Sequence, residues 1–253
     1  MYLSLGRLSQ YGRAARAVDP HRLRRYRAQV ENYPLDLEMI VSYIAAMTNI
    51  AQPNSQEQRH RGRPREFDLD HALDGAIRVF SRRGYHATSV GDLTDAMELA
   101  QGSLYKAFKD KKAVFIATME RYRIVQTERF EAAVAGFDTG YERLRAGLMF
   151  YAERSHGGVG SDGCLVVGAA ADLAALDDDI AIVVERAVKA RERIVARLVA
   201  EGQKDGSVRS KADPDDLARA MLCMMYGMRV VGKTGRSLKD MVAVVDIAMK
   251  LAE

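Results

Sequence analysis

The chain has 253 residues, of which 48% are hydrophobic and 28% are charged, as in an ordinary globular protein with one large or two modest domains. Its two cysteines, Cys164 and Cys223, are too few for a disulfide framework, and we interpret them as reduced thiols. No apolar run approaches the roughly 20 residues of a membrane span, and the N-terminus lacks the apolar segment of a signal peptide. We therefore expect a cytoplasmic protein without a membrane partner.

The positive charge is concentrated towards the N-terminal side. Residues 1–46 and 59–112 each carry a net charge of +3, whereas residues 113–253 carry −1. This asymmetry suits a polyanionic partner such as nucleic acid. A merely solvated basic surface explains the charge equally well.

Residues 1–58 predict an N-terminal extension. Residues 1–46 show a basic run but no clean helical stripe, and Thr48 to His60 have the polar composition of a disordered lead-in. We expect the extension to be disordered, or not translated before Met47. The alternative is a genuine basic arm that adds nonspecific affinity for DNA.

Three short helices are expected after this extension. Apolar residues recur at helical spacing from Leu69 to Phe80, with Asp68 as the N-cap and Gly84 as the stop. A second helix begins at Thr88–Ser89, where Ser89 and Asp92 have the spacing of a capping box. After a turn near residues 98–100, a third helix directs Leu104 and Phe108 to the core.

Longer helices fill the rest of the chain. We expect a fourth helix at 111–134, a loop at Gly157–Gly160, and helices at 180–202, 215–232 and 238–251, with Asp213 capping the penultimate one before Pro214. No strand pattern is convincing. The fold class is therefore all-α, with a DNA-binding domain at 59–126 and a second helical domain at 127–253.

The second and third short helices, joined by a tight turn, form a unit that can place its last helix in the major groove of DNA. Periodicity alone leaves an ordinary helical hairpin as an alternative. The residues Gly84-Tyr85, Thr88-Ser89-Val90, Gly102-Ser103-Leu104-Tyr105, Phe108 and Lys111 strongly resemble the TetR family of regulators (AcrR-like), over about residues 61–122. Gly163-Cys164-Leu165 and Asp213-Pro214 extend the resemblance more weakly.

The resemblance implies an N-terminal helix-turn-helix domain, a C-terminal ligand and dimerisation domain, and a homodimer. It also implies a ligand-responsive repressor that binds an inverted-repeat operator through Ser89 to Phe108 and is released by an unidentified small-molecule effector. The DNA-contacting positions it implies are Thr88, Ser89, Lys109 and Lys111 at phosphates, Gln101 and Ser103 at base edges, Gly102 at close backbone approach, Tyr105 at the DNA backbone, and Lys106 facing the groove.

Two positions depart from the family pattern. Glu98 occupies the turn position that is usually glycine, and a left-handed residue other than glycine costs about 1 kcal/mol. Ala100 replaces the usual Ser or Thr cap of the recognition helix, at a cost of about 0.5–2 kcal/mol. Both departures affect the geometry of the turn rather than the fold.

A basic arm precedes the first short helix. Arg61 and Arg63 lie in an Arg-Gly-Arg-Pro-Arg segment that resembles an AT-hook core, and such arms can lie in a narrow minor groove. The alternative is a merely solubilising tail.

The second domain offers three candidate ligand or sensing residues, Cys164, Met149 and Tyr226. A thiol at a helix start is activated, although inert core packing is the usual state of a cysteine. The methionines near Tyr226 line either a pocket, a core or a dimer seam. For the seam we predict the stripe Leu217, Met221, Met224 and Met228, in a dimer built from the helices at 180–202 and 213–232.

Catalysis has no support in the sequence. The histidines are scattered, no cluster predicts a metal site, and no nucleophile–base pair or cofactor motif is present. Two other functional classes stay open. One is an enzyme or carrier in which the helix-turn-helix is only a packing element, and the other is a nucleoid-type DNA binder with little sequence preference.

Overall fold

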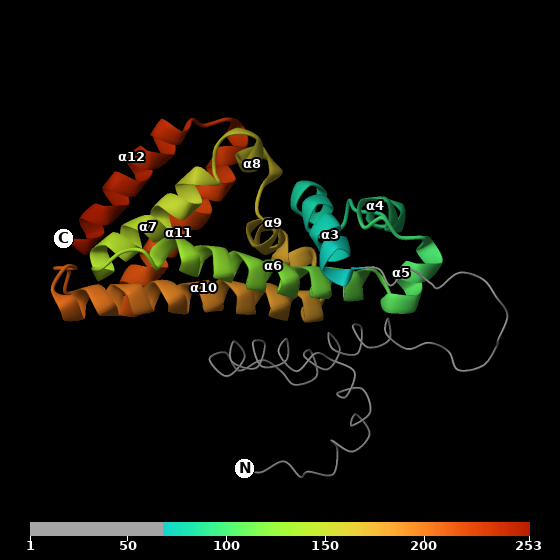
Figure 1. The fold of residues 1–253 in the computed structure, drawn as a ribbon, viewed down its shortest axis with the longest axis horizontal. Helices are drawn as coiled ribbons and strands as arrows, with labels where there is room; N and C mark the ends of the chain where they lie inside the picture. Colours follow the sequence, from blue (N-terminus) through green and yellow to red (C-terminus); the bar gives the residue numbers. More distant parts are fainter. Residues whose placement is uncertain (1–67) are drawn as a thin grey trace, which may run out of the picture.

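The computed structural model describes residues 68–253, and this part of the chain is helical without a strand (Figure 1). The predicted all-α class is therefore confirmed. The predicted extension at residues 1–58, the alternative start at Met47 and the basic arm with Arg61 and Arg63 lie outside the described residues.

The N-terminal unit consists of α3 (Leu69–Arg83), α4 (Val90–Ala96) and α5 (Gln101–Ala107). The Asp68 carboxylate accepts hydrogen bonds from two backbone N–H groups at the start of α3, and Gly84 ends this helix with φ of 76°. The apolar face of α3 is buried, and Phe80 meets Phe115 of the long helix α6 (Lys111–Val134) edge to face at 4.9 Å. The predicted start, end and inner face of the first helix are thus confirmed.

Helix α6 (Lys111–Val134) connects the two parts of the molecule. It begins where the Asp110 carboxylate accepts a hydrogen bond from the Ala113 N–H at 2.8 Å. It packs against α3 on one side and against α7 (Gly140–Glu153) and α10 (Asp178–Asp205) further along (Figure 1).

The remaining helices form the C-terminal part: α8 (Gly157–Asp162), α9 (Leu165–Ala171), α11 (Pro214–Val231) and α12 (Leu238–Met249), with 3₁₀ turns at Leu173–Ala175, Gly232–Thr234 and Lys250–Ala252. The predicted cap of Asp213 before Pro214 is confirmed, because its carboxylate accepts from two N–H groups of α11. The loop predicted at Gly157–Gly160 is wrong. This segment is helical because it packs against the Gly232–Thr234 turn, and that contact outweighs the low helix propensity of glycine.

The predicted dimer stripe on α11 is also wrong. Leu217, Met221 and Met228 are buried in the core of the single chain, and Met224 packs half-buried against the same core. The periodicity found an apolar face correctly, but this face contacts α7 and α10 rather than a second copy. The exposed apolar residues of α11 and α12 lie on other faces of these helices, among them Val230 and Ile247.

Candidate nucleic-acid interface and ligand cavity

Helix α4 is held tightly against α3. A Cβ on Gly75 would lie 1.9 Å from the carbonyl oxygen of Ala96, so only glycine permits this approach. Ser89 and Asp92 form the predicted capping box, which is confirmed. The N–H and hydroxyl of Ser89 lower the pKa of the Asp92 carboxyl, and an ion pair with Arg83 lowers it further. These contacts fix the start of α4 relative to α3.

The turn between α4 and α5 shows both predicted departures. Glu98 has φ of 55° and is the one residue other than glycine with positive φ in the described chain. The Leu99 N–H donates to the Thr94 carbonyl at 3.0 Å and stabilises the turn. Ala100 occupies the N-cap of α5 without a side-chain hydrogen bond. The turn is therefore formed at a local cost that α3 and the core must offset.

Helix α5 is anchored on one face and free on the other. Leu104, Ala107 and Phe108 are buried, which confirms the two core positions predicted for this helix. Helix α5 lies at the end of the molecule farthest from α12 (Figure 1). The exposed side chains are polar or aromatic, and they include every residue predicted to face DNA on this helix: Gln101, Gly102, Ser103, Tyr105 and Lys106, followed by Lys109.

Two residues predicted to contact phosphates have side chains that hydrogen-bond to the protein backbone instead. Thr88 is 1% exposed, and its hydroxyl donates to the Gly84 carbonyl at 2.6 Å. The Lys111 ammonium donates to the carbonyls of Tyr85 and Thr88 at 3.1 Å each, and it lies 4.4 Å from the centre of the Tyr85 ring. We correct both assignments: these side chains hold the loop before α4 in place. Ser89 stays exposed at the start of that helix.

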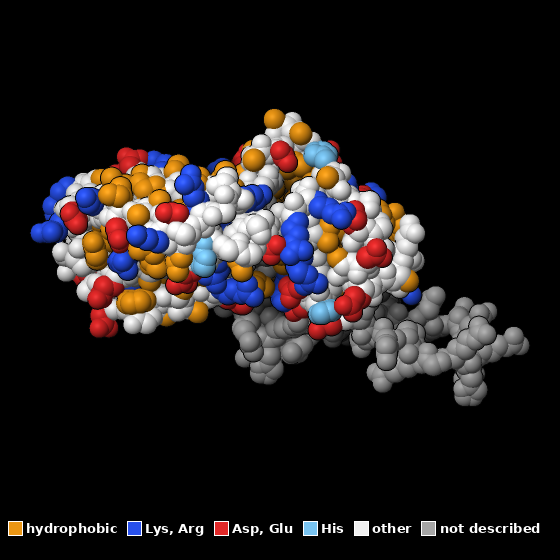
Figure 2. Space-filling view, turned by 90° about the horizontal axis from the view of Figure 1, so that it is seen from above, with side chains coloured by type: hydrophobic (Ala, Val, Ile, Leu, Met, Phe, Trp, Pro, Cys, Tyr) orange, Lys and Arg blue, Asp and Glu red, His pale blue; other side chains and the backbone are white. Residues whose placement is uncertain are grey.

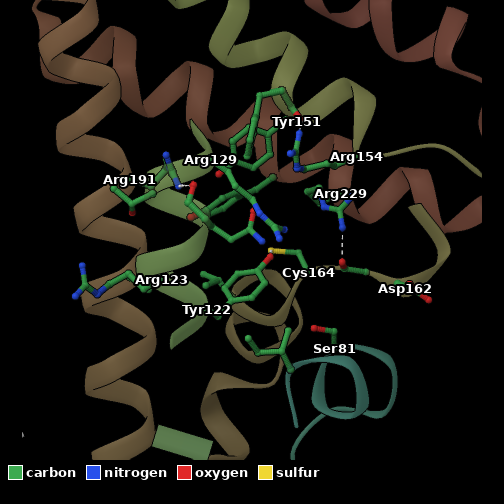
Figure 3. A pocket seen from close by; sticks show the side chains of 18 of the residues that line it. Ser81, Tyr122, Arg123, Arg129, Tyr151, Arg154, Asp162, Cys164, Arg191 and Arg229 are labelled. Carbon is green, nitrogen blue, oxygen red and sulfur yellow. Dashed lines mark hydrogen bonds between the residues drawn. The ribbon is translucent and has the colours of Figure 1, made fainter. Parts of the chain in front are cut away.

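A cavity of about 240 Å³ lies between α3, α6, α7, α8, α9, α10 and α11 (Figure 3). Cys164 and Tyr226 line it together, as do Tyr122 and Tyr151. The Tyr122 hydroxyl donates to the Cys164 sulfur at 3.2 Å. Met149, the third candidate from the sequence, does not line the cavity, because it packs against the hydrophobic core instead.

Arginines are the feature of this cavity that the sequence did not reveal. Arg191 and Arg229 are almost fully buried beside it. Arg191 donates to the Gln126 carbonyl at 3.2 Å, and its guanidinium lies 4.3 Å from the centre of the Phe130 ring. Arg229 donates to the Gly163 carbonyl, which joins α11 to the segment before α9. No local pattern could have identified them, because they come from different helices.

The described residues contain no cluster of His, Cys, Asp and Glu that could hold a metal ion. Among the helices of residues 68–253, none is both long and apolar enough to cross a bilayer. Two features of residues 68–253 can bind another molecule through polar or charged groups: the exposed face of α5 and the arginine-lined cavity.

Comparison with known proteins matches both halves of the chain. Residues 72–118 match the bacterial regulatory proteins of the tetR family, and residues 140–244 match a tetracyclin repressor-like C-terminal domain. The HTH-type transcriptional repressor ComR of Escherichia coli (strain K12) is 27% identical over 197 residues, which cover 77% of this chain and 93% of ComR.

Solved structures agree with these matches. A cysteine mutant of the TetR family transcriptional regulator CifR, complexed with a 26-base-pair operator DNA, matches with a TM-score of 0.65 and 28% identity, over 74% of this chain and 98% of that one. The reduced form of Escherichia coli NemR matches in fold, with a TM-score of 0.64 and 19% identity, over 72% of this chain and 95% of NemR.

Proposed function

The chain belongs to the TetR family of bacterial transcriptional regulators, and we propose that it represses transcription by placing two recognition helices of a homodimer on an inverted-repeat operator. The observation that carries this proposal is the geometry of α5, which is anchored by Leu104 while its opposite face is polar and free. The structure of CifR with operator DNA supports the proposal, because 98% of that chain matches this one. The family is a class of regulators, and we propose no catalytic step.

The exposed residues of α5 divide into two roles. Gln101 and Ser103 read base edges in the major groove, where each base pair presents a distinct pattern of donors and acceptors. Tyr105 and Lys109 contact the DNA backbone, Lys106 faces the groove, and Ser89 contacts a phosphate at the start of α4. Gly102 lets the helix approach closely, since no heavy atom lies within 4 Å of the place a Cβ would take. Arg61 and Arg63 enter the adjacent minor groove.

Selection of binding sites from randomised DNA, followed by salt titrations on the selected operator, tests the proposal. Lys106→Ala should weaken binding and lower the slope of log affinity against log salt by about one unit. Lys189→Ala is the matched control, because Lys189 is exposed on α10 beside Glu185 and lies outside the proposed interface. If Lys106→Ala binds as tightly as the control, the assignment of α5 is wrong.

The homodimer forms through the outer faces of α11 and α12. Val230 and Val231 are 54% and 43% exposed on α11, and Ile247 and Leu251 are 61% and 41% exposed on and just after α12. Figure 2 shows apolar side chains among the charged ones over this end of the molecule. A second copy of the chain is the expected occupant, because a symmetric operator requires a twofold pair of recognition helices.

Light scattering at micromolar concentration tests this surface. Ile247→Asp should convert a dimer into a folded monomer, since a buried unpaired charge opposes association. Ile182→Asp is the matched control, because Ile182 is a 45% exposed isoleucine on α10 away from the proposed seam. A monomeric wild-type protein, or a dimer that survives Ile247→Asp, would contradict the proposal.

A small-molecule effector binds in the cavity beside Cys164 and Tyr226, and its binding releases the operator. The cavity supports this role because α3 of the DNA-binding unit contributes Ile77, Arg78 and Ser81 to its lining. An effector in the cavity therefore contacts the DNA-binding unit directly. The protein carries out this regulation in the cytoplasm, where the operator lies.

A further inference from the structure

The cavity has an excess of positive charge. Its single carboxylate among the described residues, Asp162, is already paired with Arg82 at 2.7 Å. Arg123 is likewise paired with Glu120 at 2.9 Å. The lining arginines that have no carboxylate within ion-pair distance in the described chain are Arg78, Arg129, Arg154, Arg191 and Arg229.

Two of these arginines carry buried donors without a partner. Arg191 is 7% exposed and Arg229 is 5% exposed. In each, the Nη1 atom is buried and has no hydrogen-bond partner. A buried guanidinium is unfavourable unless an acceptor satisfies it, so these two lining arginines leave hydrogen-bond donors that an anionic ligand can satisfy.

The other groups around the cavity are also donors. Burial raises the pKa of Tyr122, Tyr151 and Tyr226, so their hydroxyls stay protonated and can donate. The pKa of Arg154 is lowered by burial and then by the nearby charge of Arg129. Figure 3 shows Arg154 and Arg229 on the same side of the cavity, above Cys164. This concentration of like charge favours an anion between the arginines.

We propose that the effector is a small organic carboxylate, held at its carboxylate by Arg154 and Arg229 and at its apolar body by the aromatic wall of the cavity. The planar guanidinium fork matches a carboxylate geometrically. The apolar body contacts Phe150, Tyr122 and Tyr226, which line the same space. The volume of about 240 Å³ suits a small ligand. The inference deepens the proposed function, since it names the chemical class of the effector.

Thermal unfolding with matched pairs of probes tests the inference. The probes are acetate, hexanoate and benzoate, each beside its neutral amide, with inorganic phosphate and chloride at equal ionic strength. At least one carboxylate should raise the Tm and weaken operator binding, whereas its amide should do neither. The amide preserves size and shape, so this difference isolates the charge.

Three variants locate the site. Arg229→Gln should weaken the binding of the stabilising carboxylate by about tenfold or more, as expected for the loss of a charged hydrogen bond. Arg129→Gln should weaken the binding of that carboxylate by about threefold. This variant keeps the test valid if Arg229→Gln does not fold, because Arg129 is exposed at the edge of the cavity. Arg197→Gln is the matched control, since Arg197 is an exposed arginine paired with Glu131 at 2.7 Å outside the cavity.

The inference is overturned if amides stabilise the protein as well as their carboxylates, if phosphate stabilises it more than every carboxylate, or if no carboxylate raises the Tm. An equal loss of carboxylate affinity in Arg197→Gln also overturns the inference, because any lost positive charge then has the same effect, inside or outside the cavity. Operator binding by the ligand-free protein is measured in the same samples. If DNA binding is intact while no carboxylate acts, the effector class alone is wrong; if DNA binding is absent, the proposed function is wrong.

Discussion

The substitution Gly75→Ala places a methyl group at the crossing of α3 and α4. The new Cβ would lie 1.9 Å from the Ala96 oxygen, 2.7 Å from the Ala96 carbonyl carbon and 3.2 Å from the Met97 nitrogen. These atoms are backbone, so no side-chain rotation relieves the overlap. Reaching a contact beyond 3.0 Å requires α4 to move by about 1 Å from α3.

Two opposing effects determine how much Gly75→Ala changes the free energy of unfolding. Alanine within a helix is favoured over glycine by about 1 kcal/mol. Overpacking of a core contact costs about 1–3 kcal/mol. The overlap is with rigid backbone, so we expect the cost to win and the variant to lose about 1–2 kcal/mol of unfolding free energy, with a Tm lower by about 2–8 °C. Operator affinity should fall by about tenfold or more, because α5 is displaced together with α4.

Urea unfolding and fluorescence anisotropy with the selected operator measure the two effects. Gly168→Ala is the matched control, because Gly168 is in α9 and no heavy atom lies within 4 Å of its would-be Cβ. This control should be as stable as the wild type or more so, with unchanged DNA binding. A Gly75→Ala protein that equals the control in both assays would refute the claim that this contact positions the recognition helix.

Three further outcomes are expected. Lys111→Met should lower the free energy of unfolding by about 1–2 kcal/mol in urea while leaving the salt slope of operator binding unchanged, whereas Lys109→Met should lower that slope by about one unit without a change in stability; the reverse pattern would restore Lys111 as a phosphate contact. The lowered pKa of Asp92 makes its carboxylate stabilising at neutral pH, and this contribution is lost as pH falls through the lowered pKa. Asp92→Asn should therefore reduce the loss of Tm at acid pH, and an unchanged pH profile would argue against the capping box. Gln101→Ala should relax sequence preference by about 1–3 kcal/mol at one position in a repeated site selection, and an unaltered consensus would exclude it as a base reader.

The elements that the sequence predicted correctly are the helices whose starts and ends are marked by capping residues. Asp68, Ser89 and Asp213 each accept hydrogen bonds from the first turn of a helix, and Gly84 ends one at positive φ. These effects act within four residues of the chain, so the sequence shows them directly. The buried face of α5 was predictable for the same reason, because Leu104 and Phe108 lie one helical turn apart.

The errors depend on contacts that are distant in sequence. Helix α8 forms despite its glycines because Gly160 and Gly232 both lie against the backbone of Ser155. Spacing marked Met221 and Met228 as one apolar face, but spacing does not distinguish the core of one chain from a seam between two. The same limit applies to Lys111, whose partners are the carbonyls of Tyr85 and Thr88, 26 and 23 residues earlier.

Helix α3 is the element through which the cavity can influence DNA binding. Its C-terminal half contributes Arg78 and Ser81 to the cavity, and Arg82 pairs with Asp162 at the end of α8. One turn before Arg78, Gly75 carries the contact with α4 and thus sets the place of α5. A ligand shifts operator affinity only by binding one arrangement of this unit more tightly than another. A ligand in the cavity meets that condition, because α3 supplies part of the cavity lining and any tilt of α3 changes the space around the ligand.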